Sequence, residues 1–399
     1  MQMKIFDFEQ EKVGQESEED ILGVEKDTLR EAVLWGTDWT TETVVAQLKK
    51  KNIELSPSFQ RRDAWGEDRK SSFIESIILG LPIPQIILAE RKDKKGSYLV
   101  IDGKQRLLSI RQFCVTDTNE DFSGLRLKGL RILKFLNGKT YNDLISDPDL
   151  SEYYSAFENQ SIRTVMIKNW PDQSFLYTVF LRLNTGSLQL SPQELRQALI
   201  PGPFISFADD FSINSTEIKQ VLNLQKPDYR MRDVEIVVRF FAFKNFIQNY
   251  DGKLKEFLDM ACMSLNSNWD TNSTEIISMA ESLNNAIRTT YAIFENDAFN
   301  KYGDGAFTNI FNRPVYDIMT YYFSDKKISD SALQKSTEIK AAFIKLCTSD
   351  NDFLRSLETS TKNIDPTAKR FGEWGNALKT ITGLDFKIPT RGRIGLELT

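Results

Sequence analysis

The spacing of apolar and polar residues predicts a small α/β domain in the first half of the chain. Residues 40–50 and 67–81 place apolar side chains three and four positions apart, which is typical of amphipathic helices. The segments QIILA and SYLVI are short continuous apolar runs, which are typical of buried strands. A tight turn separates the second run from another helical segment, QRLLSIRQFC. This order of elements suits an α/β domain.

The flanks of these elements give weaker or more local predictions. Residues 1–37 are acid-rich, with a weak helical signal near Asp27–Leu34. Thr40 or Thr41 can cap the helix that runs through Lys50. The segment IELSPSF predicts a short strand that runs into a loop, and Leu81 is expected on the apolar face of the helix at 67–81, before two prolines end it.

The pattern continues to about residue 200. Residues 125–133 look strand-like, NGKTYNDL predicts a turn followed by a short helix, and SIRTVMI predicts a buried strand. A helix is expected from Asp172 through Leu183, and a turn at 184–186 ends it.

A capping box marks the start of the next helix, because Ser191 is followed by proline and, three positions after the cap, by Glu194. Strand signals then fade, and DVEIVVRFFAFKNFI is apolar almost all round, which indicates a buried central helix. The sequence therefore predicts an α/β (α+β) chain with an acidic leader at 1–37, an α/β domain at 38–205 and a mainly α-helical domain at 206–399.

Composition places the protein among ordinary globular chains. It has 399 residues, of which 41% are apolar, and no apolar run approaches the roughly 20 residues that a membrane helix needs. The N-terminus lacks the apolar core of a signal peptide, so we expect a cytoplasmic protein without a membrane partner. Cys114, Cys262 and Cys347 have no metal-ligand spacing and are expected to be buried, reduced thiols.

Histidine is absent, which excludes several kinds of site. A Ser-His-Asp triad, a histidine general base and an HNH nuclease centre are all impossible in this sequence. Any chemistry must use carboxylates, lysine, arginine, tyrosine, amides or a metal held by oxygen ligands.

The net charge of −5 is unevenly distributed. Residues 1–50 hold 12 acidic against 6 basic side chains, and residues 51–111 hold 12 basic against 8 acidic ones. The leader is either a solvated segment or one that masks an anion site or docks a partner. The isoelectric point is about 5.3 and no long stripe of lysine and arginine is visible, so we expect DNA contact to be weak for the protein alone.

The most informative segment is YLVIDGKQRLLSIR, at Tyr98–Arg111. A strand ends before Asp102, the chain turns at Gly103 and Lys104, and a helix begins near Gln105. Glycine lets backbone amides approach a ligand, and unpaired amides at a helix N-terminus form an anion site. Lys104 and Arg106 add positive charge there, and an arginine can grip a phosphate with two hydrogen bonds. The alternative is an ordinary turn with solvated basic residues and with Asp102 as a helix cap.

Two further segments bear on this choice. SFQRRDAW, at 58–65, places an amide beside a basic pair, although it can equally be a surface basic pair with a buried tryptophan. VFLRLNTGSLQLSPQEL, at 179–195, contains an Arg-Leu-Asn-Thr-Gly turn, although a helix end, a turn and a second helix also explain it.

Together these segments resemble the GmrSD restriction-enzyme N-terminal domain family. FQRRDAW, ILGLPIPQI, VIDGKQRLLSI and FLRLNTGSLQLSPQELRQA occur in the family's order over roughly residues 40–200. The family's central motif usually reads Asp-Gly-Gln-Gln-Arg, and Lys104 replaces its first glutamine here. The resemblance implies a ParB/sulfiredoxin-like fold, in which Gly103 and Arg106 match a turn that holds nucleotide phosphates.

The resemblance also implies a function in nucleotide hydrolysis and in defence against phage DNA, often modified DNA. Members commonly carry a second, HNH-type nuclease domain, which needs histidine. We therefore expect the C-terminal half to be something else, or a nuclease or another protein to act as a separate subunit.

These inferences combine into a nucleotide-binding protein of anti-phage defence, expected to be an NTPase (a nucleoside-triphosphate hydrolase) assisted by Mg²⁺ and coupled to sensing DNA or a partner. Asp102 is the candidate catalytic residue, which orients the turn or helps to position Mg²⁺ or water, whereas no metal ligands can be assigned. The candidate nucleotide-binding residues are Gln60, Arg61, Gly103, Lys104, Gln105, Arg106 and Asn184.

Three alternatives remain open from the sequence. The first is a nucleotide-gated DNA-binding module without significant hydrolysis. The second is a ParB-like DNA nuclease, for which the sequence offers no second clustered acidic metal site. The third is a structural subunit whose turn has lost its ligand.

Overall fold

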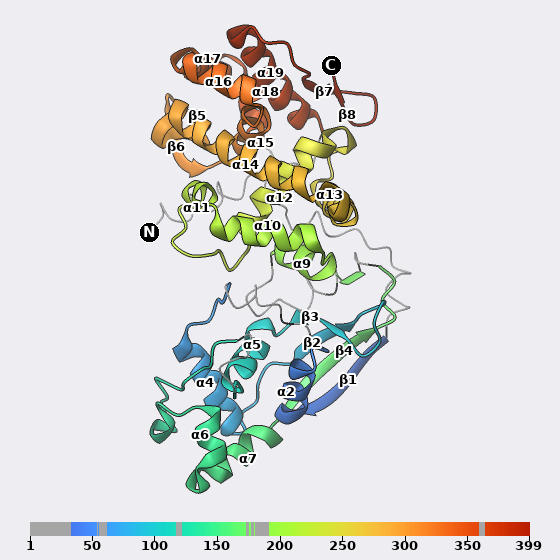
Figure 1. The fold of residues 1–399 in the computed structure, drawn as a ribbon, viewed down its shortest axis with the longest axis vertical. Helices are drawn as coiled ribbons and strands as arrows, with labels where there is room; N and C mark the ends of the chain where they lie inside the picture. Colours follow the sequence, from blue (N-terminus) through green and yellow to red (C-terminus); the bar gives the residue numbers. More distant parts are fainter. Residues whose placement is uncertain are drawn as a thin grey trace. The chain divides into compact units, whose positions relative to one another are not determined.

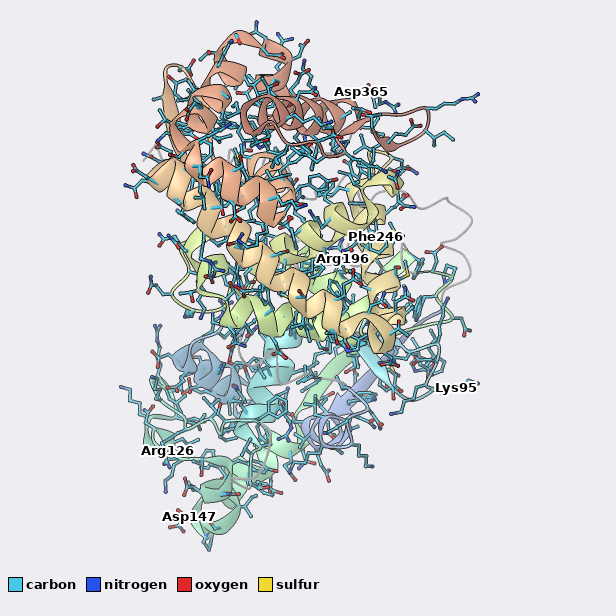
Figure 2. All side chains as sticks on the ribbon, turned by 45° about the horizontal axis from the view of Figure 1, so that its top comes forward. Lys95, Arg126, Asp147, Arg196, Phe246 and Asp365 are labelled. Atoms are coloured by element: carbon cyan, nitrogen blue, oxygen red, sulfur yellow. The ribbon has the colours of Figure 1, made fainter. Side chains whose placement is uncertain are left out.

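The computed structural model describes residues 33–53, 55, 62–116, 122–172, 175–176, 179, 191–358 and 364–399 (Figure 1). These residues form two compact units, one from residue 33 to residue 179 and one from Ser191 to Thr399. Figure 2 adds the side chains to the same ribbon. The predicted domain limit at residue 205 stays a prediction.

A four-stranded mixed sheet is the centre of the N-terminal unit, in the order β1-β4-β2-β3. β1 pairs antiparallel with β4, β4 pairs parallel with β2, and β2 pairs antiparallel with β3. The strands are β1 (Val33–Thr40), β2 (Ile86–Glu90), β3 (Tyr98–Asp102) and β4 (Ser161–Lys168). The apolar runs QIILA, SYLVI and SIRTVMI are thus strands, as their patterns predict.

The helices of this unit also follow the sequence pattern closely. Thr40 caps α2 by accepting a hydrogen bond from the amide of Thr43, which confirms the predicted start. The helices are α2 (Thr41–Lys49), α4 (Glu67–Ile78), α5 (Lys104–Phe113), α6 (Tyr141–Ser146) and α7 (Ser151–Asn159), with short 3₁₀ turns η3 (Lys134–Leu136) and η4 (Pro148–Leu150). α7 was not among the predicted elements.

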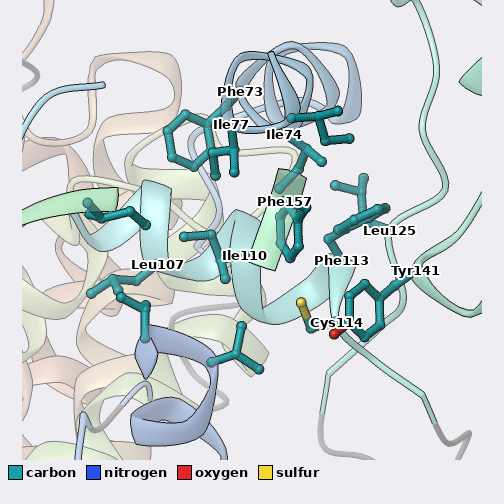
Figure 3. Packing of buried hydrophobic residues seen from close by; sticks show 14 of the residues in the cluster. Phe73, Ile74, Ile77, Leu107, Ile110, Phe113, Cys114, Leu125, Tyr141 and Phe157 are labelled. Carbon is teal, nitrogen blue, oxygen red and sulfur yellow. The ribbon is translucent and has the colours of Figure 1, made fainter. Parts of the chain in front are cut away.

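Buried side chains of α4 and α5 face one another in the core, and Figure 3 shows this packing. Phe113 at the end of α5 makes edge-to-face contacts with Phe157 and Tyr141, with ring centroids 5.3 and 5.7 Å apart. Burial and a hydrogen bond to Glu158 raise the pKa of the Tyr141 phenol. α5 is therefore held firmly by the core, which fixes the turn that precedes it.

Three local predictions were wrong. Val33 and Leu34 lie in β1 and not in a helix, and Leu81 lies beyond α4 with 44% of its surface exposed. Residues 125–133 form no strand, because several of their amides donate to the side chains of Ser71, Glu75 and Asn137 and not to a neighbouring strand. The predicted strand in IELSPSF is reduced to a single bridge between Ile53 and Tyr98 among its described residues.

The connection after β4 is described only in part. Asp172 accepts a hydrogen bond from the amide of Phe175, as expected of a helix cap, and Phe175 and Leu176 are helical and buried. The predicted turn at 184–186 lies outside the described residues.

The C-terminal unit is mainly α-helical, as predicted. α12 is buried along most of its length, in agreement with its apolar pattern, and the capping box at Ser191 and Glu194 is formed. The helices are α9 (Pro192–Leu199), α10 (Pro203–Asn214), α11 (Thr216–Val221), α12 (Arg232–Phe246), α13 (Leu254–Ser267), α14 (Trp269–Phe294), α15 (Arg313–Phe323), α16 (Lys326–Gln334), α17 (Ser336–Ser349), α18 (Asn351–Ser356) and α19 (Ile364–Thr382).

Short strands and 3₁₀ turns complete this unit. Two hairpins that the sequence pattern did not predict are β5 (Asn300–Gly303) with β6 (Ala306–Phe311) and β7 (Pro389–Arg391) with β8 (Leu396–Leu398). The 3₁₀ turns are η5 (Ile247–Asn249) and η6 (Glu295–Asp297).

Buried ion pairs join the helices of the C-terminal unit. Arg239 on α12 donates from Nε to Asp317 of α15 over 3.0 Å, and both side chains are fully buried. In the opposite direction, Arg313 on α15 donates a hydrogen bond to Glu235 of α12 over 3.1 Å. Arg196, labelled in Figure 2, pairs with Asp259 over 2.7 Å. These pairs cross-link helices that are distant in the sequence.

All three cysteines are buried, as predicted. Within the described ranges, no helix is both long enough and apolar enough to cross a membrane.

Candidate functional site

The candidate site is the turn between β3 and α5. Asp102 ends the strand, Gly103 turns the chain, and Lys104 begins the helix. Gly103 has a φ of 99°, in the left-handed region that glycine adopts without strain. The helical hydrogen bonds start with the amide of Leu107, which donates to the carbonyl of Gly103. Amides before that point have no partner inside the helix.

Asp102 holds this turn through both of its carboxylate oxygens. Oδ1 accepts a hydrogen bond from the amide of Gly103 over 2.7 Å. Oδ2 accepts from Nη2 of Arg106, also over 2.7 Å, and the two side chains form an ion pair one helical turn apart. Asp102 thus orients Arg106 and does not act as a side-chain cap on α5.

Arg106 is buried but retains hydrogen-bonding capacity. Its side chain is 8% exposed, and Nη2 donates both to Asp102 and, over 3.0 Å, to the carbonyl of Gln85 just before β2. Its Nε has no hydrogen-bond partner in the part of the chain that the structure describes. A buried N–H without a partner costs about 1–3 kcal/mol, and a ligand that supplied an acceptor at this position would remove that cost.

Gly103 lies close to this guanidinium and places no side chain against it. A Cβ at Gly103 would lie 3.4 Å from both Nε and Nη2 of Arg106 and 3.1 Å from the side chain of Ile86. Glycine is therefore required here both by the left-handed backbone and by the closeness of these neighbours.

The remaining residues of the turn are placed nearby. Lys104 is buried at the first position of α5, and Gln105, which follows it, is half-buried. The structure thus brings together Asp102, Gly103, Lys104, Gln105 and Arg106, because they are consecutive in one rigid turn. Gln60, Arg61 and Asn184 lie outside the described residues, and their predicted approach to this turn stays a prediction.

The segment that follows Arg61 is anchored in the fold. Arg62 is almost fully buried, and Asp63 pairs with Lys70 of α4. Lys70 also donates to Gln112 of α5 over 2.7 Å, and Trp65 packs edge-to-face on Phe73. Residues 62–65 are therefore fixed to α4 and α5, the helices that also support the candidate turn.

Tyr98 lies at the other end of β3 from the turn and has a shifted pKa. Burial, with a contribution from Glu90, raises the pKa of Tyr98 at the start of β3, so its phenol stays protonated. In the portion of the chain that is described, no group of three or more carboxylates, thiols or histidines could hold a metal ion.

Sequence reasoning missed two features of this unit. The carbonyl of Gln85 holds Arg106, but backbone acceptors leave no signature in a sequence. The second feature is the segment 126–139, which contains five basic side chains and no acidic one. These charges can be counted in the sequence but were overlooked.

Comparison with known proteins agrees with the resemblance seen in the sequence. Residues 44–201 match the family model of the GmrSD restriction endonuclease, N-terminal domain. No curated protein and no solved structure matches the chain. The predicted family is therefore confirmed for this stretch, as is the α+β fold with a helical C-terminal region. The match also supports the predicted role in phage restriction defence.

Proposed function

We propose that the N-terminal unit binds a nucleoside triphosphate at the turn formed by Asp102–Arg106. The observation that carries this proposal is Arg106, whose Nε is buried and has no hydrogen-bond partner among the described residues, beside a glycine that places no side chain against it. A phosphate oxygen is the acceptor that suits such a group best, because arginine and phosphate form strong charge-assisted hydrogen bonds.

Three features of the turn support a phosphate ligand in particular. The first-turn amides of α5 and the helix dipole favour an anion. Lys104 adds a second positive charge at the same end of the helix. Asp102 neutralises only part of this charge and fixes the orientation of Arg106, so that Nε does not need to reorganise when a phosphate arrives.

We further propose that the triphosphate is hydrolysed and that hydrolysis is coupled to sensing DNA or a protein partner. Mg²⁺, when bound with the nucleotide, would supply charge stabilisation at the phosphates. The chain contains no histidine, and we assign the positioning of the water to Asp102, the carboxylate that already lies at the turn. Gln60, Arg61 and Asn184 are proposed to complete the ligand contacts.

The second candidate function is a nucleotide-gated module with negligible hydrolysis. It is favoured by the same ion pair, because both oxygens of Asp102 already accept hydrogen bonds from the protein. A carboxylate so engaged is better suited to positioning Arg106 than to activating water.

The test measures release of inorganic phosphate from each of the four ribonucleoside triphosphates with Mg²⁺, with and without duplex DNA. It distinguishes the hydrolase from the nucleotide-gated module. Turnover that is lost in Asp102→Asn, while binding is retained, supports the hydrolase. Binding of equal strength without phosphate release supports the gated module. Failure of all four triphosphates to bind would contradict both.

A further inference from the structure

A basic loop lies on the N-terminal unit, and neither the fold nor the proposed nucleotide site accounts for it. We use this name for residues 126–139, RLKGLRILKFLNGK, which contain five basic side chains and no acidic one. The whole protein has a net charge of −5, so this concentration of positive charge is local. It lies within the stretch that matches the family model.

The basic loop repeats a pattern of three residues. One position in three is a buried leucine, and the two positions between successive leucines are exposed. The exposed pairs carry a basic residue first, at Lys128, Arg131 and Lys134. The second exposed position is apolar twice, at Ile132 and Phe135, which are 64% and 53% exposed. The buried leucines are Leu127, Leu130, Leu133 and Leu136.

The backbone of the basic loop is held rigidly. Glu75 of α4 is buried and accepts hydrogen bonds from the amides of Ile132 and Leu133 over 2.9 and 2.7 Å. Ser71 of α4 accepts from the amide of Lys128 over 3.1 Å. The exposed basic side chains are therefore presented from a fixed scaffold, which lowers the entropic cost of binding a ligand.

The charges at the centre of the basic loop are not neutralised by the protein. Arg131 and Lys134 form no ion pair with any residue that the structure describes. Lys128 pairs with Glu67 over 2.8 Å and Lys139 with Asp147 over 3.5 Å. The pair of Lys128 is exposed on both sides, so water screens it and it contributes little to stability.

We infer that the basic loop binds the phosphate backbone of double-stranded DNA, with Arg131 and Lys134 on phosphates and Ile132 and Phe135 against the sugars or the groove. Several exposed cations on one fixed segment suit a polyanion with regularly spaced charges. Apolar side chains placed between phosphate-binding residues are also used to wedge into a DNA groove. Two isolated apolar residues are too few to anchor a protein in a lipid surface, which requires a broad apolar face.

The basic loop and the candidate nucleotide turn are separate sites. The amide of Leu125, just before the basic loop, donates to the carbonyl of Gln112 near the C-terminal end of α5. The nucleotide turn is at the N-terminal end of this ten-residue helix, so on the order of 15 Å separates the two along the helix axis. The inference names a surface for the DNA sensing in the proposed function, and it does not depend on nucleotide binding at the turn.

The test is a salt titration of binding to an unmodified 30-base-pair duplex, with the full chain and with and without each triphosphate. Arg131→Ser combined with Lys134→Ser removes two charges without touching a buried group. We expect roughly tenfold weaker binding near 100 mM salt and a slope of log affinity against log salt that is shallower by about 2. The matched control is Lys49→Ser combined with Lys50→Ser, which removes the same charge from exposed positions at the C-terminal end of α2 and should leave both values unchanged. Ile132→Ser and Phe135→Ser should weaken binding with no change of slope.

Three results would overturn the inference. They are an equal loss of DNA binding in the control variant, unchanged DNA binding in the Arg131 and Lys134 variant, and no DNA binding by the wild type in any condition. The inference would also be overturned by stronger retention on vesicles containing phosphatidylserine than on DNA, with loss in Phe135→Ser, because that result assigns the surface to a membrane. Thermal unfolding checks that each variant is folded. The shift in melting temperature with triphosphate should be the same in the double variant as in the wild type, so failure of this inference and failure of the nucleotide proposal give different results.

Discussion

Two buried arginines show how differently the two units use a buried positive charge. Arg239 of the C-terminal unit is paired with Asp317 across two helices, and neither side chain is exposed. Arg106 of the N-terminal unit is paired with Asp102 only four residues away, Asp102 is 20% exposed, and Nε of Arg106 has no described partner. The first arrangement fixes one helix against another. The second leaves hydrogen-bonding capacity at a turn, which is what a ligand site requires.

The largest loss of stability is expected when an ion-pair partner of Arg239 is removed. Burial lowers the pKa of Arg239, but attraction and hydrogen bonding to Asp317, together with Glu235, outweigh that effect and raise it, so the guanidinium stays charged. Asp317→Ala leaves this charge buried without its closest partner. We expect the free energy of unfolding to fall by about 3–5 kcal/mol in a denaturant titration.

An exposed ion pair of the same unit provides the control. Lys326 and Asp330 are 2.8 Å apart, with 83% and 55% of their side chains exposed. Lys326→Ala should change the free energy of unfolding by less than about 1 kcal/mol. If Asp317→Ala were as mild as this control, the ion pairs between helices would not have the structural role given to them.

The second prediction concerns substitutions of Arg106 itself. Arg106→Ala should weaken triphosphate binding by about 2–5 kcal/mol, because a charge-assisted contact in a partly buried site is lost. Arg106→Lys should also bind poorly, since it keeps the charge but not the planar fork. Both variants should lose less folding stability than Asp317→Ala, because Asp102 can reach water. Calorimetric titration and denaturant unfolding measure the two effects separately. A large loss of stability together with unchanged binding would make Arg106 a structural residue like Arg239.

The third prediction concerns Gly103, which lies close to the guanidinium of Arg106. Gly103→Ala places a side chain on a left-handed backbone and should reduce the free energy of unfolding by about 1–2 kcal/mol. Gly96→Ala is the matched control, because Gly96 has a φ of 77° and nothing within 4 Å of its Cβ position. Gly103→Ala should lose more stability than Gly96→Ala, because its Cβ also lies 3.1 Å from the side chain of Ile86, and only Gly103→Ala should lose triphosphate binding. Equal binding in both would remove Gly103 from the site.

The smallest effect is expected from a thiol of the C-terminal unit. Burial raises the pKa of Cys347 to about 12, from an ordinary value of 9.0. The folded protein therefore keeps the Cys347 thiol protonated in a pH range where the unfolded chain loses this proton. The stability that this group contributes is complete below pH 9 and falls as the pH rises towards 12. Between pH 9 and pH 10 the loss should be about 1 kcal/mol. Unfolding free energies of the wild type and Cys347→Ala should diverge over this interval in the absence of any ligand, and parallel curves would contradict the assignment.

The elements that the sequence predicted well are those with a strong local signal. α5 and α12 have clear apolar periodicity, and the start at Ser191 has both halves of a capping box. The strand expected at 125–133 failed because its leucines recur every three residues and because Glu75, distant in the sequence, takes its amides. No local pattern encodes such a partner.

The candidate site was predictable to a similar degree. The turn at Asp102–Arg106 followed from a strand, a glycine and a helix in succession. The pairing of Arg106 with Asp102 could be considered from their spacing of four, but the burial of Arg106 and its bond to the carbonyl of Gln85 depend on the tertiary fold. The basic loop could have been found by counting charges, whereas its exposure could not.

The most direct test of the central claim is the shift in melting temperature caused by each of the four ribonucleoside triphosphates with Mg²⁺, measured for the wild type, Arg106→Lys and Lys326→Ala. At 100 times its dissociation constant, a ligand should stabilise the folded state by about 2.7 kcal/mol. The account predicts that at least one triphosphate raises the melting temperature of the wild type and of Lys326→Ala, and that Arg106→Lys removes the rise. An equal rise in Arg106→Lys, or no rise with any triphosphate in the wild type, would contradict it.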